Sequence, residues 1–237
     1  MIKSYSICPQ AAGKYISSLY GTKKNIWIGT DEGIYIYAYA TETFTYFDLT
    51  TPNNVRITSI VNHILQDKDG NLWFSTNGQG LFRYNLSKNY LEQYEFTSAF
   101  GIVASTMADS DNQIWALTNQ GESGVYKLNK AENKFEPFGL LYNAGNHHSQ
   151  ALAMLEDSEQ TLWLGTWECG LQKIDKYTRQ TTTYLHPTDG KGVTHIHSLM
   201  EYAPHQLLIG SDDGLLLFNT LTEEYKLFTE NETVPNS

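Results

Sequence analysis

The chain has 237 residues, of which 41% are hydrophobic and 18% charged, a composition typical of a soluble globular protein with one or two domains. Sixteen basic residues against 26 acidic ones give a net charge of −10. This balance argues against binding of a nucleic-acid backbone and against adhesion to an anionic membrane, because both need clustered Lys and Arg. Aromatic residues make up 13% of the chain and favour β-strands.

Cysteine usage and the N-terminus give little information about the compartment. The two cysteines, Cys8 and Cys169, are too few for a disulfide framework or a zinc site. No apolar run approaches the roughly 20 residues of a membrane span. The first 15 residues, MIKSYSICPQAAGKY, lack the apolar core of a signal peptide. Either the protein is cytoplasmic, or its targeting segment lies outside this sequence.

One phrase returns five times along the chain, each time centred on a Trp or on the Leu that replaces it. The copies are NIWIGTDEGIYIY, NLWFSTNGQGLFRY, QIWALTNQGESGVYKL, TLWLGTWECGLQKI and QLLIGSDDGLLLF, centred on Trp27, Trp73, Trp115, Trp163 and Leu208. The spacings are 46, 42, 48 and 45 residues. A repeat of this length fits one blade of a β-propeller.

Each copy divides into four strand-like pieces. An apolar run ends near an Asp, as in residues 60–67, and a polar turn such as KDGN follows. The Trp strand comes next, then a loop, a Gly and a third strand, and an aromatic piece such as FTYF closes the unit. No helical period persists. The sequence therefore predicts an all-β fold, a β-propeller with about five four-stranded blades, over residues 13–47, 57–94, 101–138, 148–184 and 194–228.

The repeated residues are interpreted as scaffold. Since one sheet cannot bury both of its faces alone, the Trp and its aliphatic neighbours are expected to fill the space between blades. A Gly is expected where the chain turns from the second strand into the third, at positions 33, 80, 124, 170 and 214. The Thr or Ser at 30, 76, 118, 166 and 211 is expected to bond backbone groups of that turn.

The ends of the repeat array indicate a piece of a larger propeller. Residues 1–8 are placed like an orphan closing strand, and residues 229–237 resemble the linker that introduces another blade. The alternative is a closed ring of five blades, which lies within the usual range, with the first strand added at its edge.

The phrase D-x-x-G-N-L-W-x-x-T-x-x-G-G-L-x-x-Y resembles the two-component regulator propeller repeat. Residues 67–84 fit it closely, with Gln79 in place of one Gly, and residues 157–174 fit less well. The resemblance extends from about residue 16 to residue 237. Three copies depart from the pattern. Gly21 and Tyr202 stand where the turn Asp is expected in the first and fifth copies, and the third copy has a longer loop, NQGES.

The resemblance implies a ligand-sensing role. Such repeats are similar to the periplasmic sensor regions of hybrid two-component histidine kinases of Bacteroidetes, in which propellers of the seven-bladed type precede a membrane span and a kinase core. It implies an oligosaccharide ligand, a periplasmic location, no catalysis by this segment and no cofactor. It further implies contact with the membrane only through other domains, and a homodimer of the full-length sensor.

A ligand is expected on the face that carries the loops between second and third strands and the linkers between blades, because irregular loops tend to bear function. Carboxylates, amides and aromatic rings on this face suit sugar hydroxyls and sugar rings. The candidate ligand-binding residues are Asp31, Asn77, Gln79, Asn119, Trp167, Glu168, Asp212 and Asp213 from the loops, and Tyr142, Asn146 and His148 from a linker.

Trp167 is the most distinctive of these residues. The other four copies hold Asp or Asn at its position, so the repeat itself does not require a Trp there. Two interpretations stay open. Trp167 either stacks on a ligand or partner, or packs on the long linker LLYNAGNHH.

Other chemistry finds weaker support. His195 and His197 are two residues apart on an expected strand, so their side chains would face the same way. No other residue near them completes a familiar metal-ligand spacing. We therefore expect the two histidines to line a polar channel rather than to bind a metal. DKDG at residues 67–70 resembles the opening of a calcium loop without the rest of its ligand set. Asp212 and Asp213 could serve a glycosidase, but turn chemistry explains them.

Three functions compete. The first is a non-enzymatic ligand-sensing segment. The second is a protein-interaction scaffold, which needs a broad apolar patch on the rim. The third is a propeller lyase or glycoside hydrolase, which needs convergent acid and base groups that the sequence does not identify.

Overall fold

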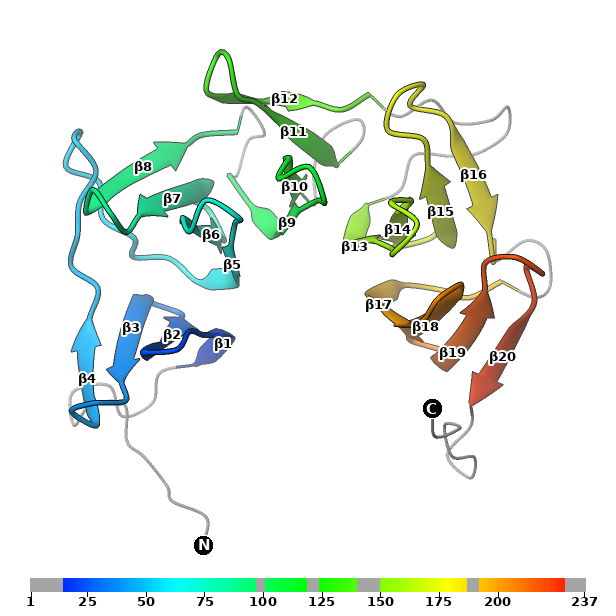
Figure 1. Cartoon of the computed structure of the whole chain (residues 1–237), viewed down its shortest axis with the longest axis horizontal. Coiled ribbons are helices and arrows are strands. Elements are labelled where there is room, and N and C mark those ends of the chain that lie inside the picture. The colour runs from blue at the N-terminus through cyan, green and yellow to red at the C-terminus, as the bar shows by residue number, and fades with distance from the viewer. Residues whose placement is uncertain (1–14, 97–100, 119–123, 140–149, 187–191, 229–237) are drawn as a thin grey trace, which may run out of the picture. The chain divides into compact units, whose positions relative to one another are not determined.

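A computed structural model describes residues 15–96, 101–118, 124–139, 150–186 and 192–228. All regular secondary structure in these ranges is β-strand, arranged as five four-stranded antiparallel sheets in which the strands follow one another in chain order (Figure 1). The predicted all-β class and the four-stranded units of a propeller segment are confirmed. Within the described ranges, no helix has the length and apolar character needed to cross a bilayer.

The chain divides into two compact units, Met1–Ala108 and Asp109–Ser237. The first contains two complete sheets and the first strand of the third: β1 (Ile16–Gly21), β2 (Asn25–Thr30), β3 (Gly33–Ala38), β4 (Thr43–Tyr46), β5 (Val61–Gln66), β6 (Leu72–Thr76), β7 (Leu81–Asn85), β8 (Tyr90–Tyr94) and β9 (Val103–Ala108). The second contains the rest of the third sheet and two more: β10 (Ile114–Thr118), β11 (Val125–Asn129), β12 (Lys134–Pro137), β13 (Ala151–Glu156), β14 (Leu162–Thr166), β15 (Leu171–Ile174), β16 (Thr181–Tyr184), β17 (Ile196–Ala203), β18 (Gln206–Ser211), β19 (Gly214–Asn219) and β20 (Tyr225–Phe228).

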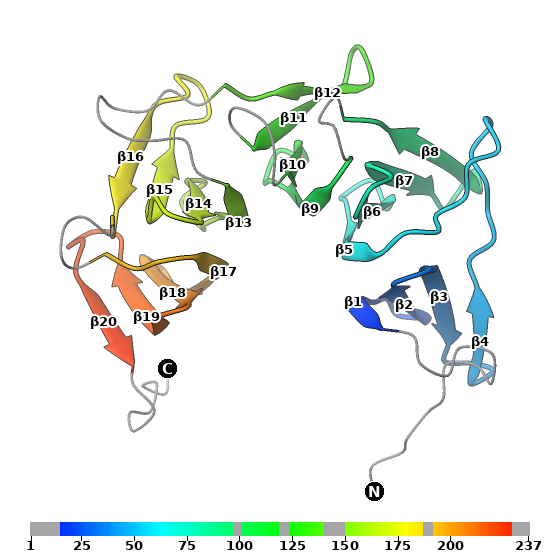
Figure 2. The same ribbon diagram turned by 180° about the vertical axis from the view of Figure 1, so that it is seen from behind.

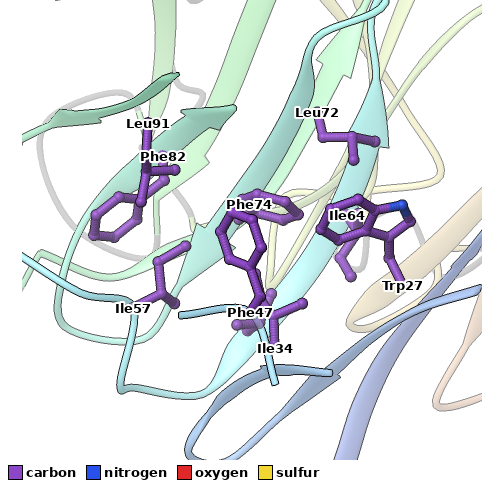
Figure 3. Close-up of a cluster of buried hydrophobic side chains, with 10 residues drawn as sticks. Trp27, Ile34, Phe47, Ile57, Ile64, Leu72, Phe74, Phe82 and Leu91 are labelled. Carbon is purple, nitrogen blue, oxygen red and sulfur yellow. The ribbon is translucent and has the colours of Figure 1, made fainter. Parts of the chain in front are cut away.

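Neighbouring sheets of the first unit pack face to face through large apolar side chains. Strand β5 contacts both β1 and β9 and lies between them in both views (Figures 1 and 2). Figure 3 shows the core between the first two sheets, where Trp27 meets Phe47 and Phe74 with ring centroids 5.4 and 5.7 Å apart. Each fully buried side chain of this size contributes about 1.5–3 kcal/mol. The Trp therefore fills the space between sheets, as predicted.

The second unit repeats this packing. Strand β13 contacts β10 on one side and β17 on the other. Trp163, which is 1% exposed, joins Leu171 of its own sheet in a cluster with Ile209, Leu216 and Phe218 of the last sheet. Both units are thus held by apolar layers between successive sheets.

A buried carboxylate supports the Trp in three of the sheets. The indole Nε1–H groups of Trp73, Trp115 and Trp163 donate to Oδ2 of the Asp six residues earlier, at 2.8, 3.0 and 2.7 Å. The other oxygen of each Asp accepts the backbone N–H that closes the polar turn. Each Asp thereby links its turn to the Trp strand, and Trp and Asp form one structural unit.

The loop from second to third strand is tied as predicted. The hydroxyl groups of Thr30, Thr76, Thr166 and Ser211 donate to the carbonyl of the Gly that opens the third strand, at 2.7–3.0 Å. These glycines have positive φ, for example +75° at Gly80, where a Cβ would lie 2.3 Å from the carbonyl oxygen of Tyr94. Only Gly fits such a position without strain.

A β-bulge recurs near the start of the first strand in four sheets. The register skips one residue in β1, β5, β13 and β17. In the first unit, the bulge residues Ser17 and Asn62 donate to the carbonyls of Val61 and Val103 in the neighbouring sheet, at 2.8 and 2.9 Å. In β17 the bulge residue is His197. A bulge re-aims a side chain, and bulges are common next to functional sites.

Candidate functional site

The loops between second and third strands lie against the linkers that lead into the next sheet, as predicted. The backbone N–H of Trp167 donates to the Gln150 carbonyl at 2.9 Å, and the backbone N–H of His195 donates to the Trp167 carbonyl at 3.0 Å. The loop after β14 is therefore fixed between the linkers that precede β13 and β17.

Four side chains of the last two sheets gather at this place. The His195 ring stacks on Trp167 with centroids 3.8 Å apart and planes inclined by 29°. His195 Nδ1 lies 2.5 Å from Oδ2 of Asp212, and His197 Nε2 lies 2.7 Å from its Oδ1. Trp167 is 39% exposed, so the group is open to solvent. We call Trp167, His195, His197 and Asp212 the Trp–His cluster.

Local backbone geometry produces the cluster. His195 has a φ of +47°, a left-handed conformation that few residues other than Gly adopt, and the next residue begins β17. His197 occupies the bulge of that strand. Both imidazoles thereby reach Asp212, which lies in the turn between β18 and β19. Ten other non-Gly residues of the described chain also have positive φ, and the bulge recurs in three other sheets, so this place is distinguished by the convergence of two imidazoles on one carboxylate.

The two hydrogen bonds determine the chemistry of the cluster. The hydrogen bond from His195, which has the larger effect, and the one from His197 hold the pKa of the Asp212 carboxyl below its ordinary value. An ionised carboxylate only accepts hydrogen bonds, so His195 Nδ1 and His197 Nε2 carry the protons. When the rings are neutral, the second nitrogen of each is an acceptor. The cluster therefore offers an indole surface beside two imidazoles that one carboxylate orients.

Other predicted residues in the described ranges hold the loops in place. Asp213 accepts from the backbone N–H and the hydroxyl of Thr194, at 2.7 and 3.0 Å. Gln79 accepts from the backbone N–H groups of Thr58 and Ser59 and donates to the Arg56 carbonyl. These side chains anchor linkers, a role that the sequence did not indicate for them.

The remaining candidates are placed as follows. Asp31 accepts from the backbone N–H of Tyr15 at 3.2 Å, while Asn77 and Glu168 are exposed. Asn119, Tyr142, Asn146 and His148 lie outside the described residues, as does the linker on which Trp167 was alternatively expected to pack. The structure brings Trp167, Asp212 and Asp213 into one part of the second unit.

The sequence placed His195 and His197 together but did not connect them with Asp212. The pairing spans 15 and 17 residues and arises from the hairpins of the last sheet, so no local motif reveals it. Within the described residues, no group of three or more His, Cys, Asp or Glu side chains is arranged to hold a metal ion.

Comparisons with known proteins agree with this architecture. The sheets and their Trp–Asp turns define the chain as a β-propeller segment. Residues 54–78, which span the polar linker, β5 and β6, match the two-component regulator propeller family. The predicted resemblance is thereby confirmed for these residues.

Histidine kinase P4 of Formosa agariphila is 26% identical over 229 residues, which cover 92% of this chain and 16% of that protein. The extracellular domain of a hybrid two-component system from B. thetaiotaomicron superimposes with a TM-score of 0.72 at 20% identity, over 90% of this chain and 29% of that one. Virginiamycin B lyase from Staphylococcus aureus gives 0.70 at 17% identity, over 94% of this chain and 72% of that one. These structural similarities show the fold, and the chain spans only a small part of the kinase.

Proposed function

We propose that this chain is a non-catalytic ligand-sensing segment of a two-component histidine kinase and that it recognises an oligosaccharide. The observation that carries the proposal is the Trp–His cluster, in which a partly exposed indole stacks on His195, His197 lies edge-on to it, and one carboxylate orients both imidazoles. An indole face binds the apolar face of a sugar ring, and imidazole nitrogens can hydrogen-bond sugar hydroxyls, which both donate and accept.

The similarity to histidine kinase P4 supports the wider setting. That protein is much longer than this chain, and the name kinase describes activity that the longer protein carries. We infer that this segment binds the signal on the outer side of the inner membrane, in the periplasm, while phosphoryl transfer occurs in other domains. Sensor kinases of this kind would act as homodimers, with the propeller segment touching the membrane only through its neighbouring domains.

A thermal-shift screen tests the binding function. The probes are neutral tetrasaccharides of glucose, galactose, mannose and xylose. We expect at least one to raise the melting temperature of the wild-type chain, because a ligand that binds only the folded state stabilises it. Trp167→Ala should abolish that increase without lowering the melting temperature of the free protein by more than about 2 °C, since the side chain lies in a loop and is 39% exposed.

Tyr39→Ala is the matched control. Tyr39 is 45% exposed and lies in the turn that follows β3, outside the Trp–His cluster. It should retain the full ligand-induced shift. If Trp167→Ala loses several degrees of stability and keeps the shift, Trp167 is a packing residue and the ligand lies elsewhere.

A further inference from the structure

A second surface of the second unit combines exposed aromatic and cationic groups. The turn Asp175–Gln180 joins β15 to β16 and presents Tyr177, which is 89% exposed. A cleft of about 460 Å³ lies on one side of this turn and a cleft of about 280 Å³ on the other. Both are lined by Lys176 and Tyr177, so the turn is a ridge between them. We call the two together the hairpin clefts.

The charge of the hairpin clefts is opposite to that of the chain. Their linings include four cationic side chains, Lys127, Lys173, Lys176 and Arg179, and two carboxylates, Asp175 and Glu136. Lys176 is paired with Glu156 and Asp109, which leaves three cations against two carboxylates. The whole chain has 26 acidic and 16 basic residues. Two clefts of similar size in the first unit, about 450 and 490 Å³, have Glu residues and no Lys or Arg in their described linings. A basic site on an acidic protein attracts anions locally.

The turn is held rigidly from beneath. Lys176 is 11% exposed and forms an ion pair with Glu156 at 2.5 Å, with Asp109 at 3.6 Å. The Asp175 carboxylate accepts from the backbone N–H groups of Tyr177 and Thr178, both at 2.8 Å. The charge of Lys176 is therefore balanced within the protein, and Tyr177 is presented on a fixed ridge.

Three other cations are differently placed. Lys173 Nζ lies 5.9 Å from the Trp163 ring centroid, Lys127 Nζ 5.2 Å from Trp115, and Arg179 Cζ 5.4 Å from Phe138. No carboxylate in the described ranges lies within ion-pair distance of these three charged groups. Contact with an aromatic face orients a cation while leaving its N–H donors available to a ligand.

We propose that the hairpin clefts bind an acidic oligosaccharide, one that carries carboxylate or sulfate groups. Tyr177 would contact a sugar ring, and the amide and hydroxyl groups of Gln160, Gln180 and Thr182 would meet sugar hydroxyls. Lys173 on one side of the ridge, and Lys127 and Arg179 on the other, would pair with the acidic groups. Amides and hydroxyls in a shallow cleft suit a saccharide better than a peptide, whose anchors need apolar pockets.

This site shares no residue with the Trp–His cluster, so it goes beyond the function proposed above and can be tested separately. Isothermal titration at low salt uses two charged probes, tetragalacturonate and sulfated maltotetraose. The uncharged counterparts are the methyl ester of tetragalacturonate and maltotetraose, and a tetraglutamate peptide tests the acidic-peptide alternative. We expect at least one charged saccharide to bind, with an affinity that falls as salt rises.

Variants locate the site. Lys173→Ala and Arg179→Ala should each weaken binding by about two- to fivefold, the usual range for exposed ion pairs. The double charge reversal Lys173→Glu and Arg179→Glu should weaken it by more than roughly tenfold. Tyr177→Ala should also weaken it, whereas Tyr90→Ala, which changes an aromatic residue in the acidic cleft of the first unit, should not.

Three results would overturn the proposal: no binding of either charged saccharide, binding that the hairpin variants leave unchanged, or tighter binding of tetraglutamate than of the saccharides. Trp167→Ala should leave the binding of charged probes intact. Its effect on neutral probes belongs to the function proposed for the Trp–His cluster, so the two proposals fail separately.

Discussion

Asp157→Asn tests the link between the polar turn and the Trp strand. Asp157 is 9% exposed, and its Oδ2 accepts from Trp163 Nε1 at 2.7 Å. Its Oδ1 accepts from the backbone N–H groups of Thr161 and Glu159, at 2.8 and 3.1 Å. Asn has only one carbonyl oxygen. If that oxygen stays on the turn, the amide NH₂ faces the indole N–H and a buried donor loses its acceptor.

The expected loss follows from these contacts. A hydrogen bond to a charged group contributes about 1.5–3 kcal/mol, and leaving a buried partner unpaired costs a similar amount, so the two terms overlap. We expect Asp157→Asn to lower the free energy of unfolding by about 2–3 kcal/mol. For a chain of this size that corresponds to roughly 4–12 °C in melting temperature.

A double-mutant cycle isolates the indole contact. Trp163→Phe removes the donor, so Asp157→Asn should cost about 1–2 kcal/mol less in that background than in the wild type. Urea unfolding followed by circular dichroism measures all four proteins. Glu159→Gln, an exposed change in the same turn, should stay within about 0.5 kcal/mol of the wild type. An equal cost of Asp157→Asn in both backgrounds would refute the proposed coupling.

Three further predictions concern stability. Gln172 is fully buried, and neither of its amide atoms has a hydrogen-bond partner in the described structure. Gln172→Leu should therefore raise the free energy of unfolding, measured by urea titration, by about 1–2 kcal/mol. A lower free energy of unfolding would show that the amide is hydrogen-bonded. Gly80→Ala and Gly70→Ala both place Ala at positive φ, but the new Cβ would clash only at position 80. Gly80→Ala should therefore lower the free energy of unfolding by at least about 1 kcal/mol more than Gly70→Ala. Equal melting temperatures of the two variants would contradict the clash. Burial raises the pKa of Asp109, but hydrogen bonds from Trp115 and the turn backbone and the charge of Lys176 outweigh it and hold the pKa below its ordinary value. The stabilisation is therefore present above the ordinary carboxyl pKa of about 4 and is lost as pH falls through the lower folded value. The stability difference between wild type and Asp109→Asn should shrink as pH falls below about 4, and a difference that stays constant would contradict this prediction.

The sequence predicted those features of the fold that repeat. A Trp every 42–48 residues, a polar turn before it and a Gly after it define the sheets, because each blade must solve the same packing problem. The Thr-to-Gly contact was also predictable, since Thr76 and Thr166 occupy the same position in their repeats. The hydrogen bond that the turn Asp accepts from the Trp was not predicted from the sequence. The fifth copy was a sign of this pairing, because it lacks both residues and has Tyr202 and Leu208 in their places.

The candidate site was less predictable because it depends on what does not repeat. Trp167 stood out against the pattern, but its contact with His195 comes from a linker whose path the repeat does not specify. The bulge at His197 recurs in three other sheets, but a different residue occupies it in each, so the repeat does not indicate a His at this place. The hairpin clefts were not anticipated, because Lys127 and Arg179 belong to different sheets and meet only through packing.

Fluorine NMR of the chain labelled with 5-fluorotryptophan tests the proposed recognition site most directly. Of the five Trp residues, Trp27, Trp73, Trp115 and Trp163 are at most 4% exposed, and only Trp167 is open to solvent. Titration with the neutral tetrasaccharides should move the Trp167 resonance, assigned by its absence in Trp167→Phe, and leave the four buried resonances in place. A Trp167 resonance that no tetrasaccharide moves, or a saccharide that moves only the buried ones, would contradict recognition at the Trp–His cluster.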